Sequence, residues 1–195
     1  DGSGFFDRFR GRLMFPIQNE SGKIIAFAGR ALAAGEDPKY LNSPETPIYH
    51  KSAVLYNLHR AKEGIRKRDR AVLVEGYMDV IGVYSAGVHE VVASCGTALT
   101  NAQVRALKRH SANLVVNFDP DAAGANAAER SIQILLEEDI RIRILELEQG
   151  LDPDEYVKQR GAAAYQEKLA AAGSYFHWLA DRARARRGAT VEGQM

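Results

Sequence analysis

The sequence predicts an α/β fold with a central, mostly parallel, four-stranded sheet flanked by helices. From residue 70 onwards, short apolar runs alternate with stretches of helical length. The run AVLVE (71–75) is continuously apolar up to Glu75, which is typical of a strand buried on both faces, and NLVVNF (113–118) has an apolar centre of the same kind. The connections between them are short, and three successive strand-to-helix steps imply parallel strands with right-handed crossovers.

Residues 1–69 are expected to form a small, basic, mixed α+β subdomain. LMFPI, a turn at NESGK and IIAFAGRAL have the pattern of a β-hairpin. The polar stretch DPKYLNSPETPIYHKS contains three of the six prolines and is expected to be a loop. A helix is expected over 52–66, with Ser52 as its N-cap.

Residues 70–160 are expected to form the main domain. Its strands are predicted at 71–75, 90–94, 113–118 and 141–147. Its helices are predicted at 78–86, at 100–110 with Thr100 as a cap, and at 122–138. Residues 161–195 are expected to begin a helical subdomain and end in a tail.

The composition limits the partners and the compartment. The 195 residues include 26 Lys+Arg and 25 Asp+Glu, but the basic residues gather before position 70 and the acidic ones between 75 and 155. A nucleic-acid surface therefore has to come from local segregation of charge. The single cysteine excludes an internal disulfide and a multi-cysteine zinc site and fits a reducing, cytoplasmic compartment. No apolar run approaches the ~20 residues of a membrane span.

Three acidic elements follow predicted strands. They are LVEGYMD with Glu75 and Asp79, FDPDAAG with Asp119 and Asp121, and GLDPDEYV with Asp152 and Asp154. The carboxyl ends of parallel strands share one edge of a sheet, so these groups are expected to converge. Carboxylates held close together repel each other unless a cation neutralises them, and Mg²⁺ favours such oxygen ligands. The sequence therefore predicts a metal site at this edge.

Other interpretations of the same residues remain open. A single acid at a strand end followed by a helix is often an N-cap or a first-turn acid, and this applies to Asp79 and Asp121. Glu75 is either a metal ligand or a proton acceptor. Most Lys and Arg side chains are simply solvated, but Arg30 and Lys39 stand in Gly- and Pro-rich loops and are expected to bind phosphate.

The motifs also resemble a known family. VEGYMDV, followed by FDPDAAG, is similar to the Toprim domain of primases, topoisomerases, recombination mediators and some nucleases. The flanking stretches DRFRGRLMFPIQNESGKIIAFAGR, PKYLNSPETPIYHKS, LYNLHRAK and ASCGTALT resemble bacterial replicative primases of the DnaG type. The resemblance extends from about Asp7 to at least Arg160.

The resemblance implies a DNA-directed RNA polymerase of the primase type, which makes RNA primers on single-stranded DNA from ribonucleoside triphosphates with Mg²⁺ or Mn²⁺. It implies catalytic and metal-binding roles for Glu75, Asp119 and Asp121, and further metal-binding roles for Asp79, Asp152 and Asp154. The residues that match the nucleotide- and template-facing basic wall are Arg8, Arg10, Arg12, Arg30, Lys39, Tyr40, Asn42 and Lys51.

The sequence departs from the family pattern in two ways. Pro120 stands where the family often has glycine, which keeps both aspartates and stiffens the loop. The zinc-binding and helicase-binding domains of the family have no counterpart here, so zinc is not expected and a replicative helicase is expected to bind only through an absent domain. The chain is therefore expected to be the Toprim-containing middle of a primase.

Two other functions use the same acidic residues. One is strand cleavage by a Toprim nuclease or topoisomerase, and the other is a non-catalytic, DNA-binding Toprim scaffold. Ribonucleotide binding that needs both metal and Arg30 or Lys39 would distinguish a primase from either of them.

Overall fold

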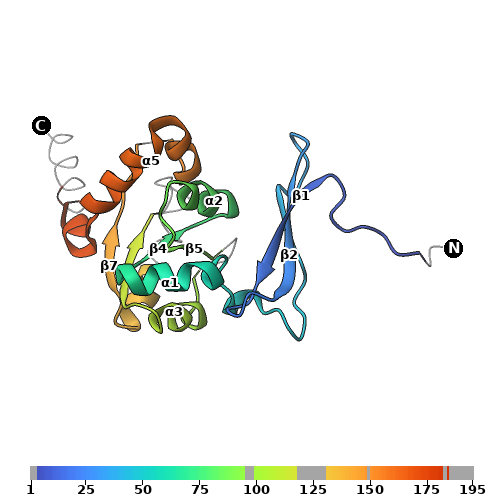
Figure 1. The fold of residues 1–195 in the computed structure, drawn as a ribbon, viewed down its shortest axis with the longest axis horizontal. Coiled ribbons are helices and arrows are strands. Elements are labelled where there is room, and N and C mark those ends of the chain that lie inside the picture. Colours follow the sequence, from blue (N-terminus) through green and yellow to red (C-terminus); the bar gives the residue numbers. More distant parts are fainter. Residues whose placement is uncertain (1–3, 95–98, 118–130, 149, 182–183, 185–195) are drawn as a thin grey trace, which may run out of the picture.

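A computed structural model describes residues 4–94, 99–117, 131–148, 150–181 and 184. Figure 1 shows two parts: an α/β part that contains most of the chain, and a long antiparallel hairpin beside it. The prediction of an α/β fold with a mostly parallel sheet is confirmed.

The sheet of the α/β part has five strands in the order β5-β4-β6-β7-β8. The first four are parallel: β4 (Ala71–Val74), β5 (Val91–Ala93), β6 (Asn113–Val116) and β7 (Arg141–Ile144). The edge strand β8 (Gly173–Ser174) is antiparallel to β7. The sequence did not predict this strand, because two small residues carry no apolar pattern.

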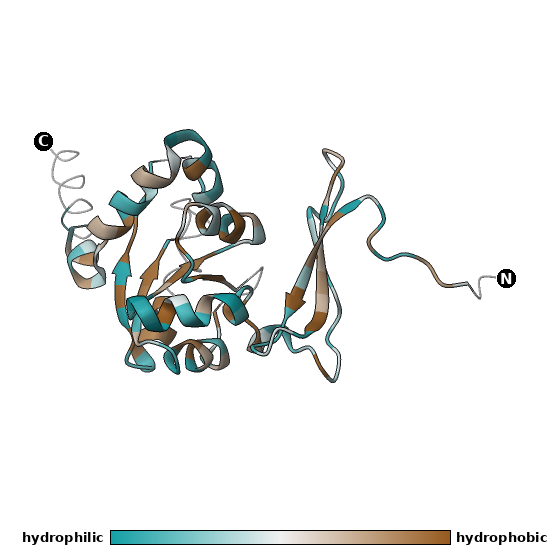
Figure 2. Ribbon diagram, viewed as in Figure 1, coloured by the Kyte–Doolittle hydropathy of each residue, from teal (hydrophilic) through white to brown (hydrophobic). Residues whose placement is uncertain are grey.

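Helices cover both faces of this sheet. They include α1 (Leu58–Arg68), α2 (Tyr77–Ser85), α3 (Asn101–Lys108) and α5 (Pro153–Ala171), and residues 131–137 are also helical. One hydrophobic cluster joins the sheet to α2 and α5, and the other joins it to α1, α3 and the helix at 131–137. Figure 2 shows the hydrophobic strands at the centre of this arrangement. This burial on both faces explains the unbroken apolar runs of the sequence.

The small sheet has the order β1-β2-β3 and is antiparallel. Strands β1 (Arg12–Gln18) and β2 (Ile24–Ala31) confirm the predicted hairpin. Strand β3 (Tyr40–Asn42) lies in the stretch that was predicted to be a loop. That prediction was wrong at these three residues, because the surrounding prolines mask a short extended segment that pairs with β2.

The predicted helix over 52–66 was wrong at its start. A short 3₁₀ helix, η1 (Lys51–Ala53), comes first, and α1 begins only at Leu58. Between them the backbone of Tyr56 pairs with that of Ala93, with 2.8 Å from the Tyr56 amide to the Ala93 carbonyl. This pairing keeps residue 56 extended, so Ser52 is not the cap of α1. Thr100, in contrast, caps α3 as predicted, accepting a hydrogen bond from the Gln103 amide.

Helix α5 crosses the predicted domain border at residue 160. Gly161 has φ 87° and ψ 166° and interrupts the helix. Beyond it, Tyr165 and Leu169 are buried in the same cluster as the sheet and α2. The division into 1–69, 70–160 and 161–195 stays a prediction. None of the helices in the described part of the chain has the length and apolar character needed to cross a membrane.

Candidate active site

A cleft of about 350 Å³ lies where the carboxyl ends of the parallel strands face the small sheet. Its lining combines acidic residues from the α/β part with three basic residues, which come from the end of β2, the segment before β3 and helix α5. The lining residues are Arg30, Lys39, Tyr40, Glu75, Gly76, Met78, Asp79, Asn117, Asp152, Pro153, Asp154, Glu155 and Lys158. The cleft therefore brings together seven of the residues proposed from the sequence, although they lie far apart in the chain.

The first acidic element surrounds the start of α2. Glu75 follows β4 directly, and Asp79 lies in the first turn of α2, where its Oδ2 accepts a hydrogen bond from the Gly76 amide at 2.9 Å. Asp79 is only 9% exposed. Burial, together with the charges of Asp152 and Asp154, raises the pKa of Asp79 to about 7, against the lowering effect of the Gly76 hydrogen bond. Asp79 thus bonds to the backbone at the start of α2 and also lines the cleft. A role as a first-turn acid is therefore compatible with a role as a metal ligand.

The second acidic element forms the start of α5. Asp152 is the N-cap, and its Oδ1 accepts a hydrogen bond from the Glu155 amide at 2.9 Å. Asp154 is buried and pairs with Lys158, with 2.5 Å between Oδ2 and Nζ. Both aspartates line the cleft, where their charges act on Asp79.

The basic wall comes from the end of β2 and the start of β3. Arg30 lies at the end of β2, and its Cζ is 6.0 Å from the centre of the Tyr40 ring. Lys39 precedes β3 and is exposed. These side chains line the same cleft as the carboxylates, so the cleft can receive a ligand with both negative charge and metal-binding oxygens.

The other proposed basic-wall residues do not line the cleft. Asn42 accepts a hydrogen bond from the Tyr77 hydroxyl at 2.7 Å. Arg8 and Arg10 are exposed near the amino-terminal end of the described chain. The Arg12 side chain is 4% exposed and donates to the Pro38 carbonyl at 2.8 Å, which fixes the segment before Lys39.

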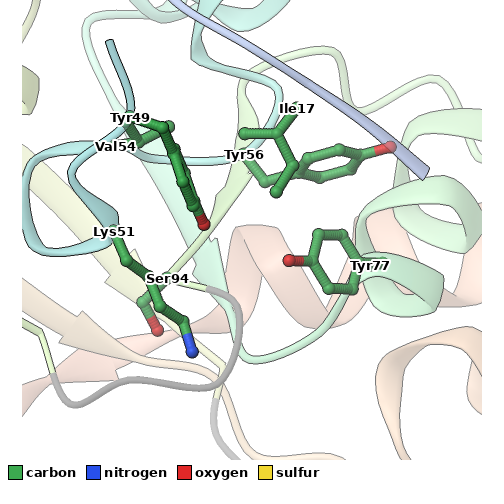
Figure 3. A pocket seen from close by; sticks show the side chains of 7 residues that line it. All are labelled: Ile17, Tyr49, Lys51, Val54, Tyr56, Tyr77 and Ser94. Atoms are coloured by element: carbon green, nitrogen blue, oxygen red, sulfur yellow. The ribbon is translucent and has the colours of Figure 1, made fainter. Parts of the chain in front are cut away.

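Lys51 lines a separate, small pocket of about 10 Å³. Figure 3 shows Lys51 and Ser94 on one side of it, with Tyr56 and Tyr77 on the other. The pocket has room for about one water molecule, and Lys51 is not among the residues that line the cleft.

Asp119 and Asp121 lie in the segment 118–130, outside the described residues. Among the residues that are described, no group of three His, Cys, Asp or Glu side chains is close enough to hold a metal ion. The chemistry of the donor set nevertheless fits a hard divalent cation, because several carboxylates meet in one cleft and their charges hinder ionisation of Asp79. A site for such a cation thus needs ligands beyond those described.

Asn117 and Lys158 are two of the cleft residues that the sequence did not predict. Asn117 follows β6, is 1% exposed, and accepts a hydrogen bond from the Tyr165 hydroxyl at 3.0 Å. Its backbone amide donates to the Leu73 carbonyl of β4 at 2.9 Å. An asparagine after an apolar run gives no sign of such a partner 48 residues away. Lys158 was missed because no helix was predicted over 153–160, so its spacing of four residues from Asp154 carried no information.

Replacing Tyr165 by phenylalanine is expected to lower the free energy of unfolding by about 1–3 kcal/mol, because the buried Asn117 oxygen loses its donor. Urea unfolding at neutral pH measures this change. Tyr84→Phe is the matched control, since Tyr84 is half-buried on α2 and packs against His89. Equal effects of the two substitutions would contradict a specific role for the Tyr165–Asn117 hydrogen bond.

Comparison with known proteins identifies both parts of the chain. Residues 1–62 match the family described as the DNA primase catalytic core, N-terminal domain, and residues 72–157 match the Toprim-like family. A DNA primase of Synechococcus elongatus is 45% identical over 188 residues, which are 93% of this chain and 27% of that relative. The chain thus spans about a quarter of the length of the curated relatives it matches.

Solved primase structures share the fold. The zinc-binding and RNA polymerase domains of the Aquifex aeolicus primase have a TM-score of 0.87 and 34% identity, over 95% of this chain and 46% of that one. A DnaG primase catalytic domain bound to single-stranded DNA has a TM-score of 0.78 and 38% identity, over 86% of this chain and 54% of that one. The match of residues 1–62 distinguishes the chain from other Toprim proteins. Together, the two adjoining family matches and the shared fold show that the chain belongs to the DnaG-type DNA primases, as a portion of their catalytic core.

Proposed function

We propose that this chain forms part of the site where a primase joins ribonucleoside triphosphates into short RNA primers on a single-stranded DNA template. The observation that supports this most directly is the cleft, in which Asp79, Asp152 and Asp154 face Arg30 and Lys39. A nucleoside triphosphate with its divalent cation carries the complementary chemistry: phosphate oxygens for the basic side chains and a metal for the carboxylates.

The acidic residues would hold Mg²⁺ or Mn²⁺. We assign the metal to Glu75, Asp79, Asp119, Asp121, Asp152 and Asp154. When bound, the cation would lower the pKa of the attacking 3′-hydroxyl and stabilise the leaving pyrophosphate. Glu75 follows β4 directly and is exposed. In this proposal it either ligates the metal or accepts the proton of the attacking 3′-hydroxyl.

The basic residues would position the substrates. Arg30 presents a planar fork suited to bidentate phosphate contacts, and Tyr40 beneath it limits the orientations of that fork. Lys39 supplies a point charge at the mouth of the cleft. Arg8 and Arg10 would extend this surface along the template, with contacts to phosphate that are insensitive to base sequence and weakened by salt. We place this reaction in the cytoplasm, at the replication fork.

Binding of a ribonucleoside triphosphate is expected to require both the metal and the basic wall. We expect measurable ATP binding with Mn²⁺ and a loss of about tenfold or more in Asp119→Asn and in Lys39→Gln, because each change removes one of the two charge interactions. Equilibrium titration of labelled ATP, with Mn²⁺ or with a chelator, measures this. Lys23→Gln is the control, since Lys23 is exposed in the hairpin turn and does not line the cleft.

The competing functions give different results in the same titration. If Mn²⁺ binds but ATP affinity is the same with and without it, the primase proposal loses its support. Metal-dependent cleavage of DNA by the same chain, without ribonucleotide binding, would then favour a Toprim nuclease.

A further inference from the structure

Lys158 is a basic side chain within an acidic part of the cleft. It lies four residues after Asp154 on α5, so both side chains project from the same side of the helix. Its Nζ is 2.5 Å from Asp154 Oδ2, and both residues line the cleft.

Asp152 and Asp154, the two aspartates at the start of α5, are neutralised in different ways. Asp152 is bonded to the amide of Glu155 at the helix start, where the peptide dipoles favour a negative charge. The Asp154 side chain is only 10% exposed, and a carboxylate that is so buried needs a charged partner. Lys158 provides that partner among the described residues, through the ion pair of its ammonium group.

The Lys158 side chain itself is 63% exposed. Its ammonium group can therefore move into water at little cost, whereas the Asp154 carboxylate cannot move without moving the start of α5. A divalent cation that approaches the Asp154 carboxylate meets the single positive charge of Lys158. This ammonium group is weakly held and occupies one of the two carboxylate oxygens.

We propose that Lys158 acts as an exchangeable counter-cation, which neutralises Asp154 in the metal-free cleft, yields to the divalent cation, and then contacts a phosphate group of the bound nucleotide. The metal and the ammonium group compete for the same carboxylate, so binding of one weakens binding of the other. Once displaced, the ammonium group remains in the cleft that Arg30 and Lys39 also line, which is the space proposed for the triphosphate. This inference rests on the proposed nucleotide-binding function of the cleft.

The test compares Mn²⁺ binding, without nucleotide, between the unmodified chain and its Lys158→Gln variant. We expect the variant to bind Mn²⁺ about three- to tenfold more tightly, because the competing charge is gone. Electron paramagnetic resonance of free Mn²⁺ gives the affinity directly. Lys168→Gln is the matched control, because Lys168 is exposed in the last turn of the same helix and does not line the cleft.

A second measurement separates this role from a purely structural one. Without metal, Lys158→Gln is expected to unfold at a lower urea concentration than the unmodified chain, because Asp154 has lost its partner. At saturating Mn²⁺ this difference is expected to disappear, and ATP is expected to bind about threefold or more weakly than to the unmodified chain. Lys158→Arg, which keeps the charge, is expected to restore ATP binding.

Unchanged or weaker Mn²⁺ binding by Lys158→Gln would overturn the exchange, and unchanged ATP affinity at saturating Mn²⁺ would overturn the phosphate contact. Both failures differ from a failure of the proposed function. In that case the unmodified chain itself would bind ATP no better with Mn²⁺ than without it.

Discussion

Alanine in place of Gly82 is expected to weaken Mn²⁺ binding by about tenfold or more and to lower the free energy of unfolding by about 1–3 kcal/mol. Gly82 lies in α2, where a Cβ atom would come within 2.8 Å of the Asp154 Cα and 2.8 Å of its Oδ1. The clash involves the backbone of α5, so it cannot be relieved by a rotamer change. The first turn of α5, with Asp152 and Asp154, has to move away from Asp79.

The two effects are measured by Mn²⁺ titration and by urea unfolding. Alanine is the better helix former by about 1 kcal/mol, so any loss of stability here reflects the helix–helix contact. Gly173→Ala is the control, because a Cβ at that glycine would meet no atom within 4 Å. Mn²⁺ affinity that is unchanged in Gly82→Ala would show that the start of α5 is not part of the metal site.

Replacing Asp79 by asparagine is expected to stabilise the metal-free chain while it weakens metal binding. The pKa of Asp79 is raised to about 7, so above pH 7 the folded chain carries a buried charge that the unfolded chain solvates freely. The folded chain binds this proton more tightly than the unfolded chain does, so stability decreases as the pH rises from about 4 to about 7. At about 1.4 kcal/mol per pKa unit, the gain from Asp79→Asn reaches up to about 4 kcal/mol at pH 8.

The pH dependence of this gain is the decisive measurement. Urea unfolding with a chelator is expected to show a gain at pH 5 that is less than half of the gain at pH 8, because Asp79 is largely protonated in the folded chain at pH 5. In Mn²⁺ the order is expected to reverse, with the unmodified chain the more stable. A gain that is the same at both pH values would mean that Asp79 is not the group with the raised pKa.

The sequence predicted the parts of the fold that have strong local patterns. Strands β4, β5 and β6 were found because burial on both faces leaves apolar runs, and the hairpin was found from its turn residues. The start of α1 was misplaced, because the pairing of Tyr56 with Ala93 is a contact across 37 residues that leaves no local pattern. Strands β3 and β8 were missed for the same reason, since each exists only through its neighbour in the sheet.

The site was predictable to a similar extent. The meeting of Asp79, Asp152 and Asp154 followed from the topology, because acids at the carboxyl ends of parallel strands share an edge. The environments of these carboxylates could not be predicted from the topology. Neither the burial of Asp79 nor the hydrogen bond between Asn117 and Tyr165 can be inferred without knowing which helix packs on which face.

Residues 51–56 join the two parts of the chain and are hydrogen-bonded to the α/β part. The buried side-chain amide of Gln103, in α3, donates to the carbonyls of Val54 at 2.8 Å and Lys51 at 3.3 Å, and Tyr56 extends the edge of the sheet beside Ala93. The Tyr77 ring stacks on Phe15 of β1 with 5.1 Å between ring centres, which ties the small sheet to the start of α2. The acidic and basic residues that line the cleft are therefore already held together without a ligand, which would preorganise the site of the proposed function. Binding free energy can then go to orienting the reacting groups instead of closing a hinge.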